Sequence, residues 1–218
     1  MSWGLTVGII VVMVMFAFFG WVIFKEALAH RFWQDKVEEG DLDMITQLVQ
    51  GEVERWRTER PPKGMPATVW QGIQGVEVVA IGRDYVHVSS TSEPQFALVG
   101  GQRRQVSNAI DEAKRISAKL AERILYDIPH VRAERAQIDV YTTFHEADGA
   151  AIQRCILTVV ATREDAATID WDNDPPEVIA EQLGARYQLD GRGVPQAIEP
   201  EAVRVSSNGA RGTAETLS

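Results

Sequence analysis

An unbroken apolar run near the N-terminus constrains this chain more than any other feature. Residues Trp3 to Phe24 cover 22 positions without a charged side chain. At a helical rise of about 1.5 Å per residue, such a run crosses the roughly 30 Å hydrocarbon core of a bilayer. The sequence therefore predicts a single transmembrane helix within residues 1–24.

The charges around this run predict its orientation. No Lys or Arg precedes it, whereas Lys25, Arg31 and Lys36 follow it closely, and basic residues mark the cytoplasmic side of a span. A cleaved signal peptide would need a basic segment before the run and a small-residue cleavage site after it. We therefore expect a single-pass protein of the cell (inner) membrane, with its N-terminus outside and its soluble domain in the cytoplasm.

Residue types inside the run suggest how it sits in the bilayer. Trp3 and Trp21 lie near opposite ends, where indole rings favour the two membrane interfaces. Gly4 and Gly8 have GxxxG spacing, and Gly20 adds a small residue, so a second helix could pack here, although glycine is also simply common in membrane helices. The run has no ionisable side chain that could serve as a proton relay or a histidine ligand.

Residues 25–68 are predicted to form a helical juxtamembrane connector that ends in a Pro-rich linker. Phe32 and Trp33 lie beyond the membrane interface, and we expect them to contact a partner subunit, the protein's own domain or lipid headgroups. An apolar stripe with three-four spacing predicts an amphipathic helix over 41–59, for which a role on the membrane surface is one interpretation, although the acidic residues of its polar face favour packing on protein. Prolines 61, 62 and 66 end this segment.

Residues 69–187 are predicted to form the globular domain. Alternating apolar residues predict hairpins over 76–88 and 96–106, the second turning at Gly100-Gly101, and strands over 138–144 and 152–162. A short helix is predicted after Asp174, and it ends at Gly184. The predicted fold class is α+β: one N-terminal transmembrane helix, a helical connector, and a soluble domain whose mainly antiparallel sheet is packed by one long helix.

The long helix is predicted over 107–126, with Ser107 or Asn108 as its N-cap. Its polar side is interpreted as a solvated face that includes Glu112 and Arg123. Residues 188–218 are rich in small and polar residues without periodicity, which predicts an extended low-complexity tail.

Composition limits the classes of partner and compartment. The formal charge is −9 and none of it lies in residues 1–24, so the domain should repel phosphate backbones and nucleic acid is not expected as a partner. The lone cysteine, Cys155, lies in an apolar run and is interpreted as a small core residue, in keeping with a reducing compartment.

Two weak patterns could hold an ion. Asp170, Asp172, Asp174 and Glu181 match the ligand spacing of an EF-hand calcium loop, but Pro175 stands where the turn glycine belongs, and helix capping explains Asp174 equally well. Arg103 and Arg104 after the Gly-Gly turn could contact a phosphate or lipid headgroup, or could simply belong to a charged strand.

No motif in the chain specifies a reaction. Its four histidines lie far apart, without the paired spacing of a metal site, and the default interpretation is four structural or exposed side chains: His30, His87, His130 and His145. We therefore expect no catalytic residues, no metal and no cofactor.

These features favour a non-catalytic accessory or scaffold subunit that stabilises a larger membrane protein complex, with other membrane subunits and the bilayer as its partners. In layout alone, the chain resembles the H subunit of photosynthetic reaction centres, which implies an energy-transducing complex; no motif carries this resemblance. The alternative is a membrane-tethered enzyme or ligand-binding domain whose site assembles only in three dimensions.

Overall fold

The structure is a computed structural model that describes residues 42–146 and 149–201. Its elements follow in the order α2 (Leu42–Thr58), α3 (Ala67–Gln74), β1 (Glu77–Ile81), β2 (Tyr85–Thr91), β3 (Gln95–Val99), β4 (Gln102–Ser107), α4 (Ala109–Glu122), the π-helix η1 (Arg123–Asp127), β5 (Arg135–His145), β6 (Ala151–Thr162), α5 (Arg163–Ala166), α6 (Pro176–Gln182), β7 (Arg186–Leu189) and β8 (Pro195–Gln196).

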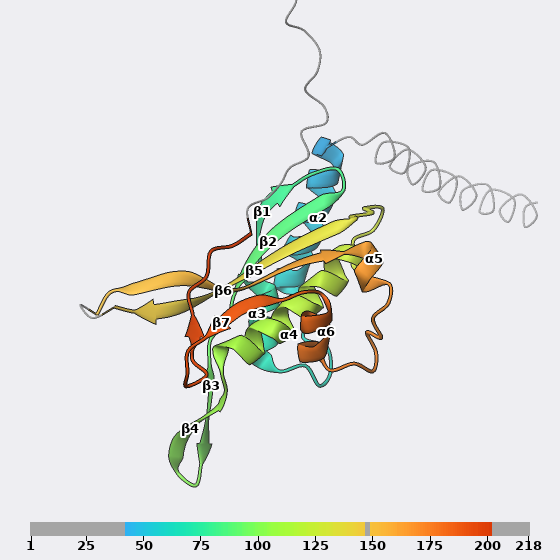
Figure 1. Cartoon of the computed structure of the whole chain (residues 1–218). Coiled ribbons are helices and arrows are strands. Elements are labelled where there is room, and N and C mark those ends of the chain that lie inside the picture. The colour runs from blue at the N-terminus through green and yellow to red at the C-terminus, as the bar shows by residue number, and fades with distance from the viewer. Residues whose placement is uncertain (1–41, 147–148, 202–218) are drawn as a thin grey trace, which may run out of the picture.

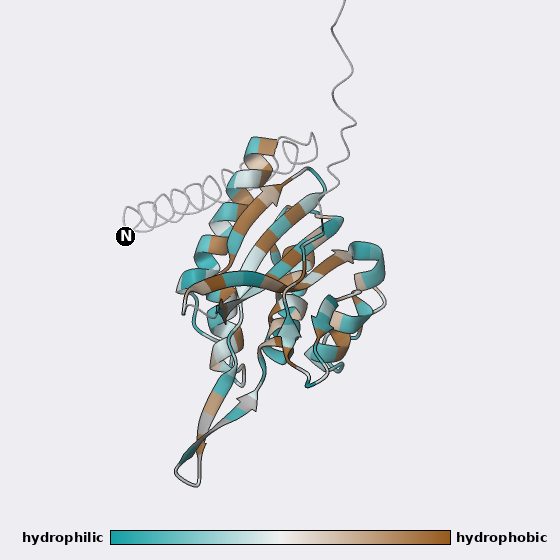
Figure 2. Ribbon diagram, turned by 60° about the vertical axis from the view of Figure 1, so that its left-hand side comes forward, coloured by the Kyte–Doolittle hydropathy of each residue, from teal (hydrophilic) through white to brown (hydrophobic). Residues whose placement is uncertain are grey.

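One six-stranded sheet forms the centre of the domain. Its strand order is β1-β2-β5-β6-β7-β8, and β3 and β4 form a separate two-stranded sheet. All main-sheet pairings are antiparallel except that of β2 with β5, which is parallel. Helices α2, α3 and α4 lie against one face of the sheet (Figure 1). Brown and teal segments follow one another along the central strands in Figure 2, as expected for strands with one face in the core.

The core lies between this sheet and its helices. The apolar stripe of α2 is buried through Ile45, Val49, Val53 and Trp56, which belong to the same core cluster as strands β2, β5 and β6. The amphipathic helix predicted over 41–59 is thus confirmed, and it packs on protein within the domain rather than apart from it. Burial against the sheet is what holds such a helix in place.

Local signals in the sequence located several elements correctly. Gly100 and Gly101 have φ angles of 62° and 80° and form the β3–β4 turn, because glycine alone adopts positive φ without a Cβ penalty. The Asn108 side chain accepts a hydrogen bond from the Asp111 backbone N–H at 2.8 Å, which caps α4. The predicted hairpins over 76–88 and 138–162 are present as β1–β2 and β5–β6.

The predicted fold class is wrong. The structure shows a mixed α+β domain whose main sheet is antiparallel in every pairing but one, because β5 returns beside β2 in the same direction after the chain passes through the β3–β4 hairpin and α4. Helices α2, α3 and α4 share the sheet face that was assigned to one helix, and α3 begins directly after Pro66, where a linker was expected. Within residues 42–146 and 149–201, no helix has the length and hydrophobicity needed to cross a membrane.

Several sequence predictions lie outside the described residues. They comprise the span over 3–24 and the residues assigned to its interfaces, to helix packing and to partner contact: Trp3, Trp21, Gly4, Gly8, Gly20, Phe32 and Trp33.

The polar side of α4 is not a solvated face. Glu112 is fully buried and accepts hydrogen bonds from the Thr68 hydroxyl at 2.7 Å and from Arg115 at 2.9 Å. Arg115 also binds Glu177 of α6 at 2.6 Å. The reason for the error is that α4 has neighbours on two sides, since the sheet covers its apolar stripe while α3 and α6 pack against its flank.

Arg123, the first residue of η1 directly after α4, is a second buried charge, with 6% of its surface exposed. Its guanidinium carbon lies 5.3 Å from the ring centre of Trp56 and 5.1 Å from that of Trp70. Its Nη1 donates to Glu59 at 3.1 Å. The cation is therefore held between two indole rings from α2 and α3, an arrangement that joins both helices to the end of α4.

Candidate functional site

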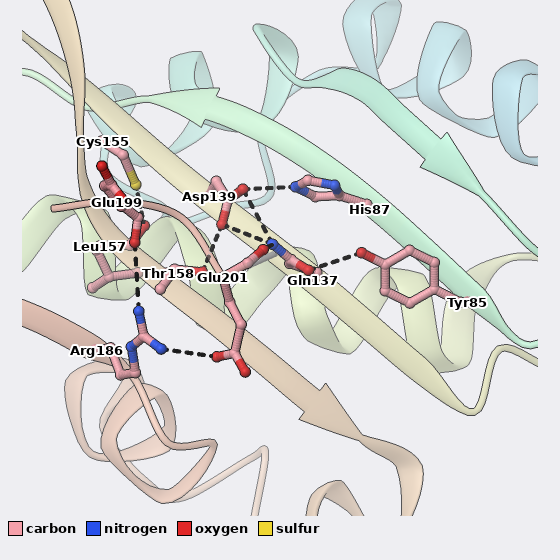
Figure 3. A network of polar contacts seen from close by, with 10 residues as sticks. All are labelled: Tyr85, His87, Gln137, Asp139, Cys155, Leu157, Thr158, Arg186, Glu199 and Glu201. Carbon is pink, nitrogen blue, oxygen red and sulfur yellow. Dashed lines mark hydrogen bonds and ion pairs between the residues drawn. The ribbon is translucent and has the colours of Figure 1, made fainter. Parts of the chain in front are cut away.

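A buried polar network lies on the sheet face that the helices leave uncovered (Figure 3). Strands β2 and β5 pair in parallel, with His87 opposite Gln137 and Ser89 opposite Asp139. Successive side chains of a strand point to opposite faces, so Val88 and Ile138 lie in the core while these polar residues lie on the other face of the sheet. Parallel pairing thus brings together side chains that are about fifty residues apart in the sequence.

Asp139 is the centre of the network and is only 1% exposed. Its Oδ2 lies 2.7 Å from His87 Nε2, and its Oδ1 accepts from the Thr158 hydroxyl at 2.6 Å. The Gln137 amide adds longer contacts of 3.3 and 3.4 Å. A buried carboxylate is tolerated only when donors surround it, and here strands β2, β5 and β6 each supply one.

Gln137 extends the network in two directions. Its Oε1 accepts from the Tyr85 hydroxyl at 2.8 Å, and its Nε2 donates to the backbone oxygen of Glu201 at 2.9 Å. Burial, and then the charge of Asp139, raise the pKa of Tyr85 to about 12. Tyr85 therefore stays a hydrogen-bond donor at neutral pH.

The C-terminal segment 197–201 lies against this network. The Ile198 backbone N–H donates to the Cys155 carbonyl at 2.9 Å, and Arg186 binds the Glu201 carboxylate at 3.1 Å. Residues 188–201 fall in the part that was predicted to be an extended tail. They are held because the sheet provides the partners that this segment cannot supply from within itself.

Cys155 lies beside Asp139 as a buried thiol. Its Sγ donates to the Leu157 carbonyl at 3.3 Å. Burial, and then the charge of Asp139, raise its pKa to about 12. Because only the thiolate is a good nucleophile, Cys155 is not an activated nucleophile at neutral pH.

This geometry predicts the reactivity of the only cysteine. We expect the native chain to remain unlabelled by a thiol-specific disulfide reagent at both pH 7 and pH 9, since both values lie well below the raised pKa. Unfolding in guanidinium chloride should expose one reactive thiol per chain. The absorbance of the released thiolate measures both reactions, and rapid stoichiometric labelling of the native chain would contradict the buried position.

The structure does not bring the calcium candidates together. Asp170 accepts from Asn173, and this hydrogen bond lowers the pKa of the Asp170 carboxyl. Glu181 instead binds Lys114 at 2.6 Å and accepts from the Tyr187 hydroxyl. Asp172 and Asp174 do not join these two residues in a common ion site. The described residues contain no group of three or more His, Cys, Asp or Glu side chains placed to hold a metal ion.

The other candidate residues lie apart from the network. Arg103 and Arg104 lie in β4, where their backbones pair with those of Leu98 and Ala97, respectively. The structure does not describe the two arginine side chains. His145 is exposed at the end of β5, and His130 adopts a φ of 64° in the loop before it. Of the histidines within the described residues, only His87 joins the buried network.

The network was missed because nothing local marks it. The available signal was a pair of polar residues, Gln137 and Asp139, on alternate positions of an otherwise apolar strand. In a half-buried strand such a pattern is usually solvent-facing, so pairing with His87 and Thr158 could be recognised only once the strand neighbours were known.

Comparison with protein-family models, with curated proteins and with solved structures found no match to this chain. Its function must therefore be inferred from its own residues. The network positions several donors around one carboxylate and fixes the C-terminal segment, and both roles are structural.

Proposed function

We propose that this chain is a non-catalytic accessory subunit that docks onto a larger membrane assembly and stabilises it. The observation that carries the proposal is the β3–β4 hairpin. It forms a two-stranded sheet of its own and projects from the body of the domain (Figure 1). A hairpin without a third strand is only marginally stable in water, so a covering partner would stabilise it.

The hairpin presents apolar surface to that partner. Leu98 is 79% exposed near its tip, and Phe96 is 47% exposed nearer its base. Beside the base lies a groove of about 740 Å³, whose lining includes Phe96, Phe144, Val194 and Pro195. Exposed apolar side chains grouped in this way mark candidate protein interfaces. We assign the groove and hairpin to a segment of another subunit.

The location at a membrane rests on the sequence. The uncharged residues 3–24 favour attachment to the cell membrane, and the basic residues that follow favour a cytoplasmic domain. Other membrane subunits and lipid are therefore the proposed partners. No comparison supports one particular assembly, and the proposal names none.

The test uses gentle detergent extraction of membranes that contain the full-length chain. Wild-type protein should co-migrate with a large complex in native electrophoresis, and Leu98→Glu should shift most of it to the size of the free chain. Val178→Glu, which changes another exposed apolar residue on α6, is the matched control and should leave co-migration intact. A wild-type chain that migrates alone, or a Leu98→Glu chain that still co-migrates, would overturn the proposal.

A further inference from the structure

The outer half of the β5–β6 hairpin has an edge without a neighbouring strand. Strand β2 pairs with β5 only as far as Thr91 opposite Tyr141, and the Ser92 N–H donates to the Tyr141 carbonyl at 2.8 Å. The chain then leaves the sheet toward the β3–β4 hairpin, whereas β5 and β6 continue together to His145 opposite Ala151. From residue 142 onward, no described strand pairs with β5 on the side of β2.

The backbone groups on this edge are assigned from their neighbours. Successive residues of a strand direct their N–H and C=O groups to alternate sides. The Tyr141 carbonyl faces β2, and the Glu146 N–H faces the returning chain, where it donates to the Ala150 carbonyl at 2.9 Å. The residues between them follow the same alternation, so Thr143 and His145 direct both of their backbone groups to the open side.

This open edge borders the groove beside the β3–β4 hairpin. The groove of about 740 Å³ is lined by residues 142–145 of β5 and by Glu93 and Pro94, where the chain leaves the line of β2. The Thr143 hydroxyl donates to the Glu93 carboxylate at 2.9 Å, which places this edge of β5 next to the departing chain. An extended segment in the groove would therefore take the position that a longer β2 would have.

The edge at residues 142–145 also lacks the features that protect exposed edges from strand addition. Such features are bulges, prolines, charged side chains and short length. At one end of the main sheet, the pairing of β1 with β2 has a bulge between Val78 and Ala80, and at the other end β8 has two residues and begins with Pro195. Residues 142–145 keep a regular register with β6 and include no proline, Lys, Arg, Asp or Glu.

We propose that the partner segment assigned to this groove binds as an added β-strand, through backbone hydrogen bonds to Thr143 and His145. The inference rests on the proposed function and specifies the form of the partner. A helix uses its backbone groups internally and would leave this edge unpaired, whereas an extended chain supplies both donors and acceptors to it.

The two faces of the sheet define the side chains of this segment. Phe144 packs against the core cluster and lines the groove together with Val194. Thr143 and His145 lie on the opposite face, because successive side chains of a strand alternate. Every second side chain of the added strand would contact Phe144 and should be apolar, while those between would lie beside Thr143 and His145 and should be polar.

A proline substitution separates backbone pairing from side-chain contact. His145→Pro removes an outward-facing N–H that the β5–β6 hairpin does not use, and proline at an edge prevents a further strand from pairing. His145→Ala removes the imidazole but keeps the N–H. In native electrophoresis of gently extracted membranes, His145→Pro should lower the co-migrating fraction of the full-length chain by about tenfold or more, and His145→Ala should stay within about twofold of wild type. Equal co-migration of the two variants would overturn the inference.

Hydrogen exchange gives a second measurement that needs no substitution. Resolved to single residues by fragmentation mass spectrometry, the amides of Thr143 and His145 should exchange about tenfold or more slowly in the purified complex than in the free chain. The Phe144 amide, which faces β6, is the internal control and should be protected in both. Unchanged exchange at Thr143 and His145 would overturn the inference even if His145→Pro failed to fold. A wild-type chain that migrates alone, or a Leu98→Glu chain that still co-migrates, would instead overturn the proposed function itself.

Discussion

Asp139→Ala is expected to lower the free energy of unfolding by about 3 kcal/mol or more, because it removes the acceptor shared by buried donors on three strands. His87 and the Thr158 hydroxyl would each lose a hydrogen bond of normal length, and both side chains are buried in the folded state. Urea denaturation followed by circular dichroism measures the change.

The control for this prediction is Asp139→Asn, which keeps the size of the side chain and one acceptor oxygen. It should cost clearly less than the alanine variant, since the histidine and the hydroxyl can still find a partner on the amide. A loss of less than about 1 kcal/mol in Asp139→Ala would show that the network contributes little to stability.

Arg123→Ala is expected to cost about 3 kcal/mol through a different mechanism. The substitution empties the space between the Trp56 and Trp70 rings and removes two desolvated cation–π contacts together with the packing of the arginine stem. Because both indoles are buried against this side chain, the tryptophan emission of the folded state should also change.

Arg123→Lys separates charge from shape in the same position. Lysine keeps the positive charge but lacks the flat guanidinium that stacks on indole rings, so an intermediate loss is expected. Alanine and lysine variants with wild-type stability would mean that α2 and α3 do not depend on this cation for their packing on α4.

The sequence predicted those parts of the fold that depend on neighbouring residues. The positive φ of Gly100 and Gly101 and the Asn108 cap act over a few positions, and the stripe of α2 repeats over one helix. Such signals can be interpreted without knowing what the rest of the chain does.

The features that could not be predicted depend on contacts between distant segments. Nothing near residue 88 indicates that β2 will pair with residues 135–141, and without that pairing Asp139 looks like a solvent-facing residue. Glu112 and Arg123 were misassigned for the same reason, because their burial arises from α3 and α6 rather than from α4 itself. The candidate site could therefore not be recognised in the sequence, because no local pattern indicates that its polar residues lie on neighbouring strands.

The parallel pairing of β2 with β5 also has a consequence for the order of folding. Val88 and Ile138 are direct neighbours in the sheet but are separated by fifty positions, so their contact requires a long loop to close. The β1–β2 and β5–β6 hairpins rest on local contacts, whereas the pairing of β2 with β5 is non-local and is expected to form later than either hairpin. The His87–Asp139 contact joins these two strands, so its formation would report the closure of the sheet.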